Sequence, residues 1–207
     1  FQNVDDILRD LGMDTSEANE RAVRILAYNQ TELTEENIKT IRQADETVQR
    51  TFSSMSPAVT LAMIRRGINP LDMDMDTLNQ TAVDVKSELG DEDTERYQKY
   101  LWKLEQNNDI SEEERSSYIG IYRLIAQVEK TDGAAIGSLM QQGAPITMRS
   151  LLTAVRTGNK GSMDYQVDDQ FSGVDNVAKN ERIDDQIMAA YHTNCLHDAA
   201  EALTPQA

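Results

Sequence analysis

The aspartates at positions 72, 74 and 76 are the sharpest candidate for chemistry in the sequence. Carboxylates at alternate positions begin a calcium loop, because side chains spaced in this way can converge on one hard cation. The full EF-hand pattern also needs glycine at its sixth position and glutamate at its twelfth, where this chain has Thr77 and Val83. We therefore expect a solvated loop in which Asp76 caps the following helix. The alternative is a calcium or other cation site at Asp72, Asp74 and Asp76.

A second cluster of reactive side chains lies near the C-terminal end, at His192, Cys195, His197 and Asp198. A zinc site needs four converging ligands, and the chain has only one cysteine and two histidines. A thiolate–imidazole pair needs an orienting third group, and neighbours on one helix rarely align in this way. The segment 158–162 has the composition of a phosphate loop without the Walker order. We therefore predict no catalytic residues and no cofactor.

The composition narrows the class of partner. The chain has 207 residues and a formal net charge of -16. Such a field repels nucleic acid, whose binding requires Lys and Arg to neutralise phosphates, and it disfavours anionic membrane surfaces. We expect a protein partner, no nucleic acid and no membrane span, since no apolar run approaches the ~18 residues that a span needs.

The single cysteine bears on the compartment. One cysteine forms no internal disulfide, so the fold does not depend on an oxidising environment. We expect a cytoplasmic protein. The chain begins at Phe1 inside a helix-like stretch and ends at 203–206 with what reads as the cap and first turn of another helix. We therefore expect a segment of a longer protein.

Helical periodicity and capping signals follow one another along the chain. Only 5% of residues are aromatic, so the core must be built from aliphatic side chains, which suit helix packing. We predict an all-α fold, an array of short helices and helical hairpins packed as a bundle. The expected helix starts are Asp14, Thr34, Ser56 with Pro57, Asp76, Asp91, Ser111 with Glu114, Asp132 and Thr147. The third helix should bury Ile38, Ile41, Val48, Phe52 and Met55.

Four segments are expected from these patterns. Residues 1–56 form a three-helix segment, and residues 57–156 form a helical bundle. Residues 157–177 are polar and glycine-containing, as in a loop or linker. Residues 178–207 hold a last helix and the start of a truncated element. That helix begins near Ala178 and should turn inward Ile183, Ile187, Ala190 and Tyr191.

The N-terminal segment resembles a ubiquitin-associated three-helix module. The resemblance rests on Leu11-Gly12-Met13, Ala22-Val23, Leu26 and a third helix from Thr34. It implies a hydrophobic binding patch made by the Leu-Gly-Met turn and the end of the third helix. The third helix is longer here than in that family.

A broader resemblance covers most of the chain. It rests on the phrases NQTELTEENI at 29–38, SEEER at 111–115 leading into YIGIYRLI at 118–125, and GAPIT at 143–147 leading into Leu151-Leu152. These phrases resemble a domain of unknown function in large helical proteins of flagellated, clostridia-like bacteria, some of them similar to flagellar hook-length control proteins. The resemblance implies a non-catalytic structural or protein-interaction domain of a larger bacterial protein, connected with flagellar assembly.

Overall fold

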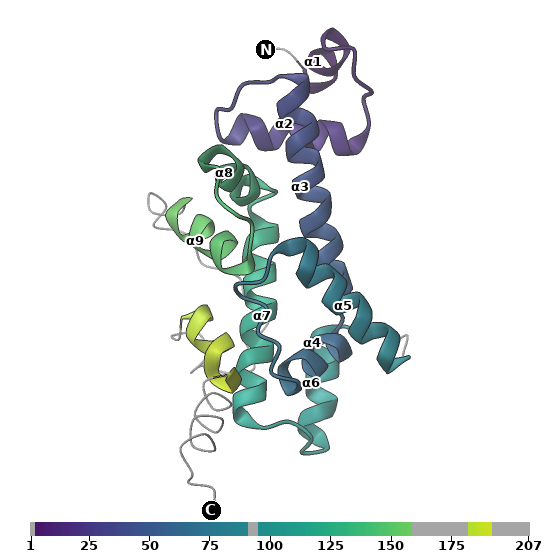
Figure 1. Ribbon diagram of the computed structural model, residues 1–207, viewed down its shortest axis with the longest axis vertical. Helices are drawn as coiled ribbons and strands as arrows, with labels where there is room; N and C mark the ends of the chain where they lie inside the picture. The colour runs from purple at the N-terminus through teal and green to yellow at the C-terminus, as the bar shows by residue number, and fades with distance from the viewer. Residues whose placement is uncertain (1–2, 91–94, 159–181, 192–207) are drawn as a thin grey trace, which may run out of the picture.

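The computed structural model describes residues 3–90, 95–158 and 182–191, and every regular element in these residues is a helix (Figure 1). The elements are α1 (Val4–Asp10), α2 (Glu17–Tyr28), α3 (Glu35–Ser54), α4 (Pro57–Arg65), α5 (Met75–Leu89), α6 (Tyr97–Gln106), α7 (Glu112–Lys130), α8 (Ala134–Gln142), α9 (Met148–Gly158) and a final helix at 183–191. The predicted all-α class is confirmed. None of the described helices combines the length and the apolarity needed to cross a lipid bilayer.

Two long helices, α3 and α7, organise the molecule (Figure 1). Helix α3 packs against α2 and α8 and, farther along its length, against α5. Helix α7 packs against α4 and α9. One cluster of buried apolar side chains extends from Leu8 in α1 to Tyr191 in the final helix. The predicted inward residues of the third helix are all buried, namely Ile38, Ile41, Val48, Phe52 and Met55.

Several helix starts lie where the sequence predicts them. The Thr34 side chain accepts a hydrogen bond from the Asn37 amide at the start of α3. Ser111 and Glu114 form a reciprocal capping box at the start of α7. The first backbone amides of a helix have no carbonyl partner within the helix, so each such cap supplies a hydrogen bond that the helix itself cannot make.

Three predicted caps are wrong, and in each case the N-cap is the residue directly before the first helical position. Helix α2 is capped by Ser16, not Asp14, and α5 is capped by Asp74, not Asp76. Helix α8 begins after Gly133, an N-cap without a side-chain hydrogen bond, while Asp132 adopts a left-handed backbone conformation. Asp91 lies outside the described residues, and the described part of α6 begins after Arg96.

Asp132 belongs to a group of five side chains that we call the polar clamp: Arg21, Tyr28, Asp45, Gln49 and Asp132. Arg21 donates to both carboxylate oxygens of Asp45, at 2.7 and 3.1 Å, and to Asp132 at 2.6 Å. Tyr28 donates to Asp132, and Gln49 donates to Asp45. The hydrogen bond that Arg21 donates to Asp45 is the main cause of a raised Arg21 pKa. The clamp joins α2, α3 and the start of α8.

Close backbone approach reinforces this junction. Gly133 has φ +88°, and a Cβ built there would lie 2.4 Å from Cδ1 of Ile25 in α2. Only glycine fits both the positive φ and the contact. The N-terminal helices are therefore fixed against α8 by shape as well as by charge.

Three tyrosines pack together around α7, two of them from this helix and one from α6. The rings of Tyr97 and Tyr122 are stacked at 4.5 Å, and Tyr118 meets Tyr122 edge-on at 4.9 Å. The buried Tyr122 hydroxyl donates to the Met55 carbonyl at 2.9 Å, and burial raises the pKa of Tyr122. The only tryptophan, Trp102 of α6, lies in contrast on the surface, 58% exposed.

Candidate functional site: a helix-binding groove on α7

The structure does not bring the three aspartates of the predicted cation loop together. The Asp72 carboxylate is bound by the Arg149 guanidinium through two contacts of 2.6 and 3.1 Å. Asp74 accepts from the Thr77 amide as the cap of α5, and Asp76 is exposed in the first turn of that helix. Among the described residues, no group of three or more His, Cys, Asp or Glu side chains could hold a metal ion. Helix capping and an ion pair therefore account for Asp72 and Asp74.

We expect millimolar calcium to leave the melting temperature of the protein unchanged, because Asp72 is paired with Arg149 and Asp74 points at a backbone amide. Asp74→Ala should lower stability by about 1 kcal/mol through loss of the cap, equally with calcium and with EDTA. Differential scanning calorimetry measures both effects. A calcium-dependent rise that Asp74→Ala abolishes would instead establish a cation site here.

The other reactive cluster of the sequence, His192, Cys195, His197 and Asp198, lies outside the described residues. The predicted loop at 157–177 lies there too, except that α9 continues through Gly158 and so extends two residues past the predicted end of the bundle at 156.

One of the two parts of the patch implied by the ubiquitin-associated resemblance, the end of the third helix, is buried in the structure. The end of α3 is covered, since Phe52 is 8% and Met55 2% exposed. Helix α3 is 20 residues long and packs against α5. Its C-terminal end is therefore part of the shared core rather than a binding face.

The final helix 183–191 packs closely against α7, at a contact formed by Ser116, Ser117, Gly120 and Arg123. We call this contact surface the α7 groove. A Cβ built on Gly120 would lie 2.8 Å from Cγ1 of Ile187 and 3.0 Å from its backbone nitrogen. The absence of a side chain at Gly120 thus allows the backbones of two helices to touch.

The serines of the groove bind the backbone of the final helix. The Ser117 hydroxyl donates to the Ile187 carbonyl at 2.6 Å and accepts from the Ala190 amide at 3.1 Å. The Ser116 hydroxyl donates to the Gln186 carbonyl at 3.3 Å. Contacts to backbone groups recognise a helix as such, and they place few demands on its side chains.

The side chains of the final helix make apolar and charged contacts with the rest of the bundle. Four predicted inward residues, Ile183, Ile187, Ala190 and Tyr191, are buried as expected. The buried Arg123 guanidinium donates to Oε1 of Gln186 at 2.5 Å, and Arg156 of α9 pairs with Asp184 at 2.9 Å.

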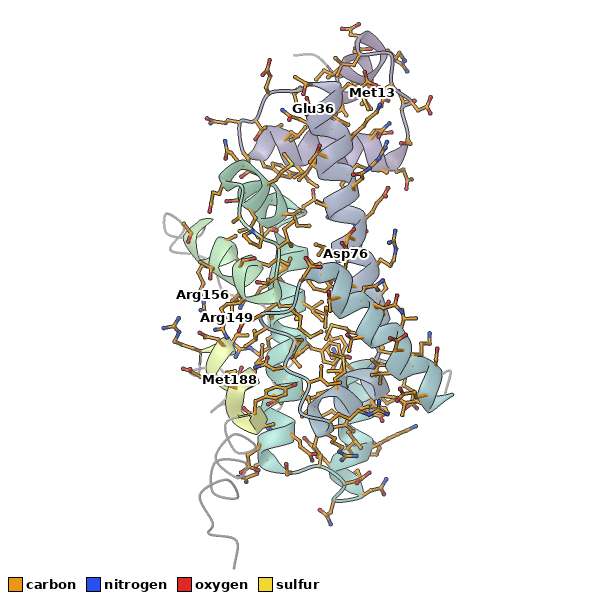
Figure 2. All side chains as sticks on the ribbon, in the orientation of Figure 1. Met13, Glu36, Asp76, Arg149, Arg156 and Met188 are labelled. Atoms are coloured by element: carbon orange, nitrogen blue, oxygen red, sulfur yellow. The ribbon has the colours of Figure 1, made fainter. Side chains whose placement is uncertain are left out.

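The loop after α4 closes the far side of the groove. The Tyr191 hydroxyl donates to the Ile68 carbonyl at 2.8 Å, and the Asn69 amide contacts the Met188 sulfur at 3.1 Å. Figure 2 shows Arg149 and Arg156 on the side of the molecule where Met188 marks the final helix. The groove therefore combines an apolar floor, backbone-binding serines and a basic rim.

The Asp184 ion pair gives helix docking a defined pH dependence. The hydrogen bond from Arg156 lowers the Asp184 pKa, and the charge of Arg182 acts in the same direction. Because the Asp184 pKa is lower in the folded state, the charged carboxylate stabilises the folded protein at pH values above the ordinary aspartate pKa of about 3.9. This stabilisation is lost as the pH falls through the lower folded-state pKa. We expect the difference in melting temperature between wild type and Asp184→Asn to be constant from about pH 5 to pH 8, to shrink as the pH falls below about 4, and to vanish only below the lowered folded-state pKa. A difference that persists unchanged at low pH would show that the charge of Asp184 is irrelevant to docking.

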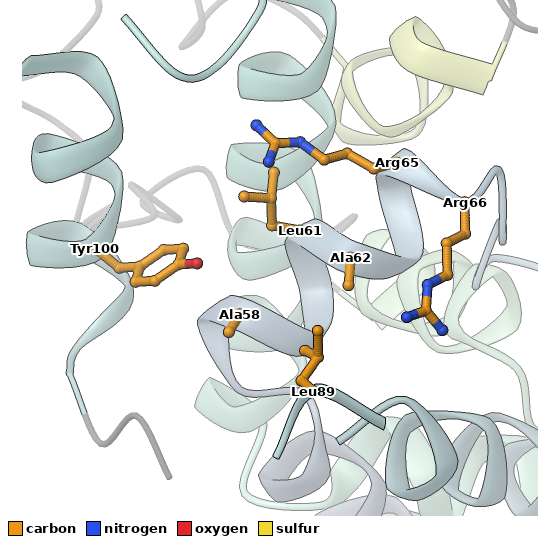
Figure 3. A pocket seen from close by; sticks show the side chains of 7 residues that line it. All are labelled: Ala58, Leu61, Ala62, Arg65, Arg66, Leu89 and Tyr100. Atoms are coloured by element: carbon orange, nitrogen blue, oxygen red, sulfur yellow. The ribbon is translucent and has the colours of Figure 1, made fainter. Parts of the chain in front are cut away.

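A second hollow, of about 420 Å³, lies between α4, α5 and α6 (Figure 3). Its floor is apolar, and it is lined by Ala58, Leu61, Ala62, Arg65, Arg66, Leu89 and Tyr100. Both arginines are already engaged, Arg65 with Glu114 at 3.0 Å and Arg66 with Glu88 at 2.5 Å. The hollow is therefore an apolar surface patch beside two arginines whose charges are already paired with carboxylates of the same chain.

Sequence reasoning missed the α7 groove, although one signal was present. A glycine inside a helix costs about 1 kcal/mol relative to alanine, so it usually has a packing reason. Gly120 follows Ser117 by three residues in the most regular helix of the chain, which places two small residues on one face. That spacing indicates a close helix contact, but it does not identify the contacting helix.

Comparison with known proteins agrees with a domain of unassigned role. A family model described as "Family of unknown function (DUF6240)" matches residues 1–152. The match begins before α1 and ends within α9, so it includes all four residues of the α7 groove and excludes the final helix. No curated protein and no solved structure matches the chain.

Proposed function

Because the chain belongs to the DUF6240 family of unknown function, we propose its role from its geometry: it is a non-catalytic protein-interaction domain that binds an α-helix in the α7 groove. The observation that carries this proposal is the final helix itself. It is held by Ser117 through its backbone and by the close approach at Gly120. A surface that already binds one helix has the chemistry to bind another.

The use of the polar side chains supports a non-catalytic role. The buried carboxylate of Asp45 is neutralised by Arg21, and the buried Tyr122 hydroxyl bonds to a backbone carbonyl. Asp72 and Asp74 serve in an ion pair and a helix cap. These groups stabilise the fold, and none of these contacts leaves a nucleophile beside a base.

The biological setting that we propose is a larger bacterial protein, cytoplasmic and connected with flagellar assembly. This part of the proposal rests on the resemblance of the capping phrases at 29–38, 111–125 and 143–152 to domains in such proteins. A helical adaptor suits an assembly role, because helix-in-groove contacts join proteins without chemistry.

The test compares three baits, each made of the 207 residues of this chain, in a lysate of the native cell, read by quantitative mass spectrometry. The first bait is the wild-type chain. The second, Ile187→Asp, places a charge in the buried interface and so releases the final helix from the groove. The third combines Ile187→Asp with Gly120→Leu, so that the final helix is released and the leucine side chain fills the groove. We expect a saturable partner that the vacated bait retains and the filled bait loses. The two variants expose similar apolar surface, so the comparison removes non-specific binding. Equal retention on both variants, or nothing above background on any bait, would contradict the proposed function and favour a spacer role.

A further inference from the structure

The final helix occupies the α7 groove as a separable segment of the chain. It lies beyond the 1–152 family match, while Ser116, Ser117, Gly120 and Arg123 lie within it. Nine residues of this helix, 183–191, lie in the described part of the chain. Most of the stability of a helix comes from the packing of its amphipathic face, and here that face is buried against the groove.

From this arrangement, and resting on the proposed function, we infer that helix 183–191 is an internal competitor for the α7 groove, and that the external ligand is an acidic amphipathic helix of another protein. The groove is open to that ligand only when helix 183–191 leaves. The same surface cannot hold both, because Gly120 leaves room for one backbone at contact distance.

The groove defines the chemistry of the external helix. Its floor takes isoleucines four residues apart, as at Ile183 and Ile187, followed by a small residue in the place of Ala190. A side-chain oxygen is required where Gln186 meets Arg123. These four positions follow one face of a helix at i, i+3, i+4 and i+7.

Charge selects an acidic helix. Arg123 donates to Gln186 of the docked helix, and Arg156 pairs with Asp184. The hydrogen bond to Asp72 is the main cause of a raised Arg149 pKa, and the charge of Asp184 acts in the same direction. Two arginines thus contact the docked helix directly, on a chain of net charge -16. A helix that carries carboxylates in its first turn, as this one carries Asp184 and Asp185, gains both from the arginines and from its own dipole.

The covalent connection sets how strongly the internal helix competes. A tethered segment acts at an effective concentration on the order of 1 mM. If the same helix binds as a free peptide with a dissociation constant of about 10 μM, the groove is open about 1% of the time, and the apparent affinity for an external helix falls about 100-fold.

The test uses the full chain and a fluorescein-labelled synthetic peptide of residues 180–193, with binding followed by fluorescence anisotropy. We expect the peptide to bind the Ile187→Asp chain, to bind wild type at least ~10-fold more weakly, and not to bind Ile187→Asp with Gly120→Leu. A second vacated chain, Ala190→Pro, removes the amide that Ser117 binds and should behave like Ile187→Asp. Circular dichroism on each chain confirms that the bundle is folded.

The charge of the ligand is tested with a peptide in which Asp184 and Asp185 are replaced by lysine. We expect it to bind the vacated chain at least ~10-fold more weakly, with the difference shrinking in high salt. Equal affinity of the two peptides would overturn the selection of an acidic helix.

Three results would overturn the internal competitor. Equal affinity of wild type and Ile187→Asp would show that helix 183–191 does not block the groove. A wild-type dimer that becomes a monomer on Ile187→Asp, by light scattering, would show that the helix comes from a second copy. No peptide binding to either vacated chain, with a groove-dependent partner still captured from lysate, would refute this inference while the proposed function stands.

Discussion

Arg21→Met is expected to lower the free energy of unfolding by about 3 kcal/mol. The substitution leaves the buried carboxylate of Asp45 without its bidentate cation, and an unpaired buried charge is far more costly than the ion pair is favourable. It also removes the 2.6 Å contact that holds Asp132 at the start of α8. Urea denaturation followed by far-ultraviolet circular dichroism measures the change.

Arg24→Met is the matched control. Arg24 lies one turn along the same helix, its side chain is 43% exposed, and its nitrogen is 3.7 Å from the Asp132 carboxylate. An exposed pair of this kind contributes less than about 1 kcal/mol. If the two substitutions proved equally costly, the polar clamp would not stabilise the junction in the way we describe.

Gly120→Leu is expected to destabilise the wild-type chain by about 2 kcal/mol. The new side chain would occupy the place of Ile187, whose Cγ1 and backbone nitrogen lie 2.8 and 3.0 Å from the built Cβ. Two close-packed backbones cannot move apart without breaking the hydrogen bonds between Ser117 and the final helix.

The sign of this effect should reverse when the groove is vacated. In the Ile187→Asp background, Gly120→Leu should stabilise the chain by up to about 0.8 kcal/mol, because leucine favours a helix interior more than glycine does. The four chains form a double-mutant cycle, measured by urea denaturation. A cost that is the same in both backgrounds would mean that Gly120 is required for the folding of α7 itself.

The positions of the helices could be predicted from the sequence because their signals are local. Thr34, Ser56 with Pro57, and Ser111 with Glu114 are immediate neighbours of the helices that they start. The prediction failed at Asp14, Asp76 and Asp132, where two or more polar residues could cap the same helix. The choice among them depends on which residue directly precedes the first helical turn, and at Asp132 it also depends on Arg21, which lies 111 residues away.

The site could not be predicted because its parts are far apart in sequence. The residues Ile183, Ile187, Ala190 and Tyr191 were correctly placed on one face of a helix, but nothing local indicates that this face meets Gly120. Asp45 shows the same limit. It interrupts the apolar positions of α3, and only the fold reveals that it is buried against a cation from α2. Periodicity identifies a face, while the partner of that face is a property of the whole chain.

The exposed position of Trp102 decides which spectroscopic signals can report on this protein. An indole that already contacts water emits at long wavelength in the native state, so unfolding hardly changes the colour of its fluorescence. The stacked rings of Tyr97 and Tyr122 are held rigidly in the core and should give a near-ultraviolet circular dichroism signal that disappears on melting. A fluorescence melt of this chain would therefore follow only the neighbourhood of α6, while the tyrosine dichroism would follow the packing of the bundle.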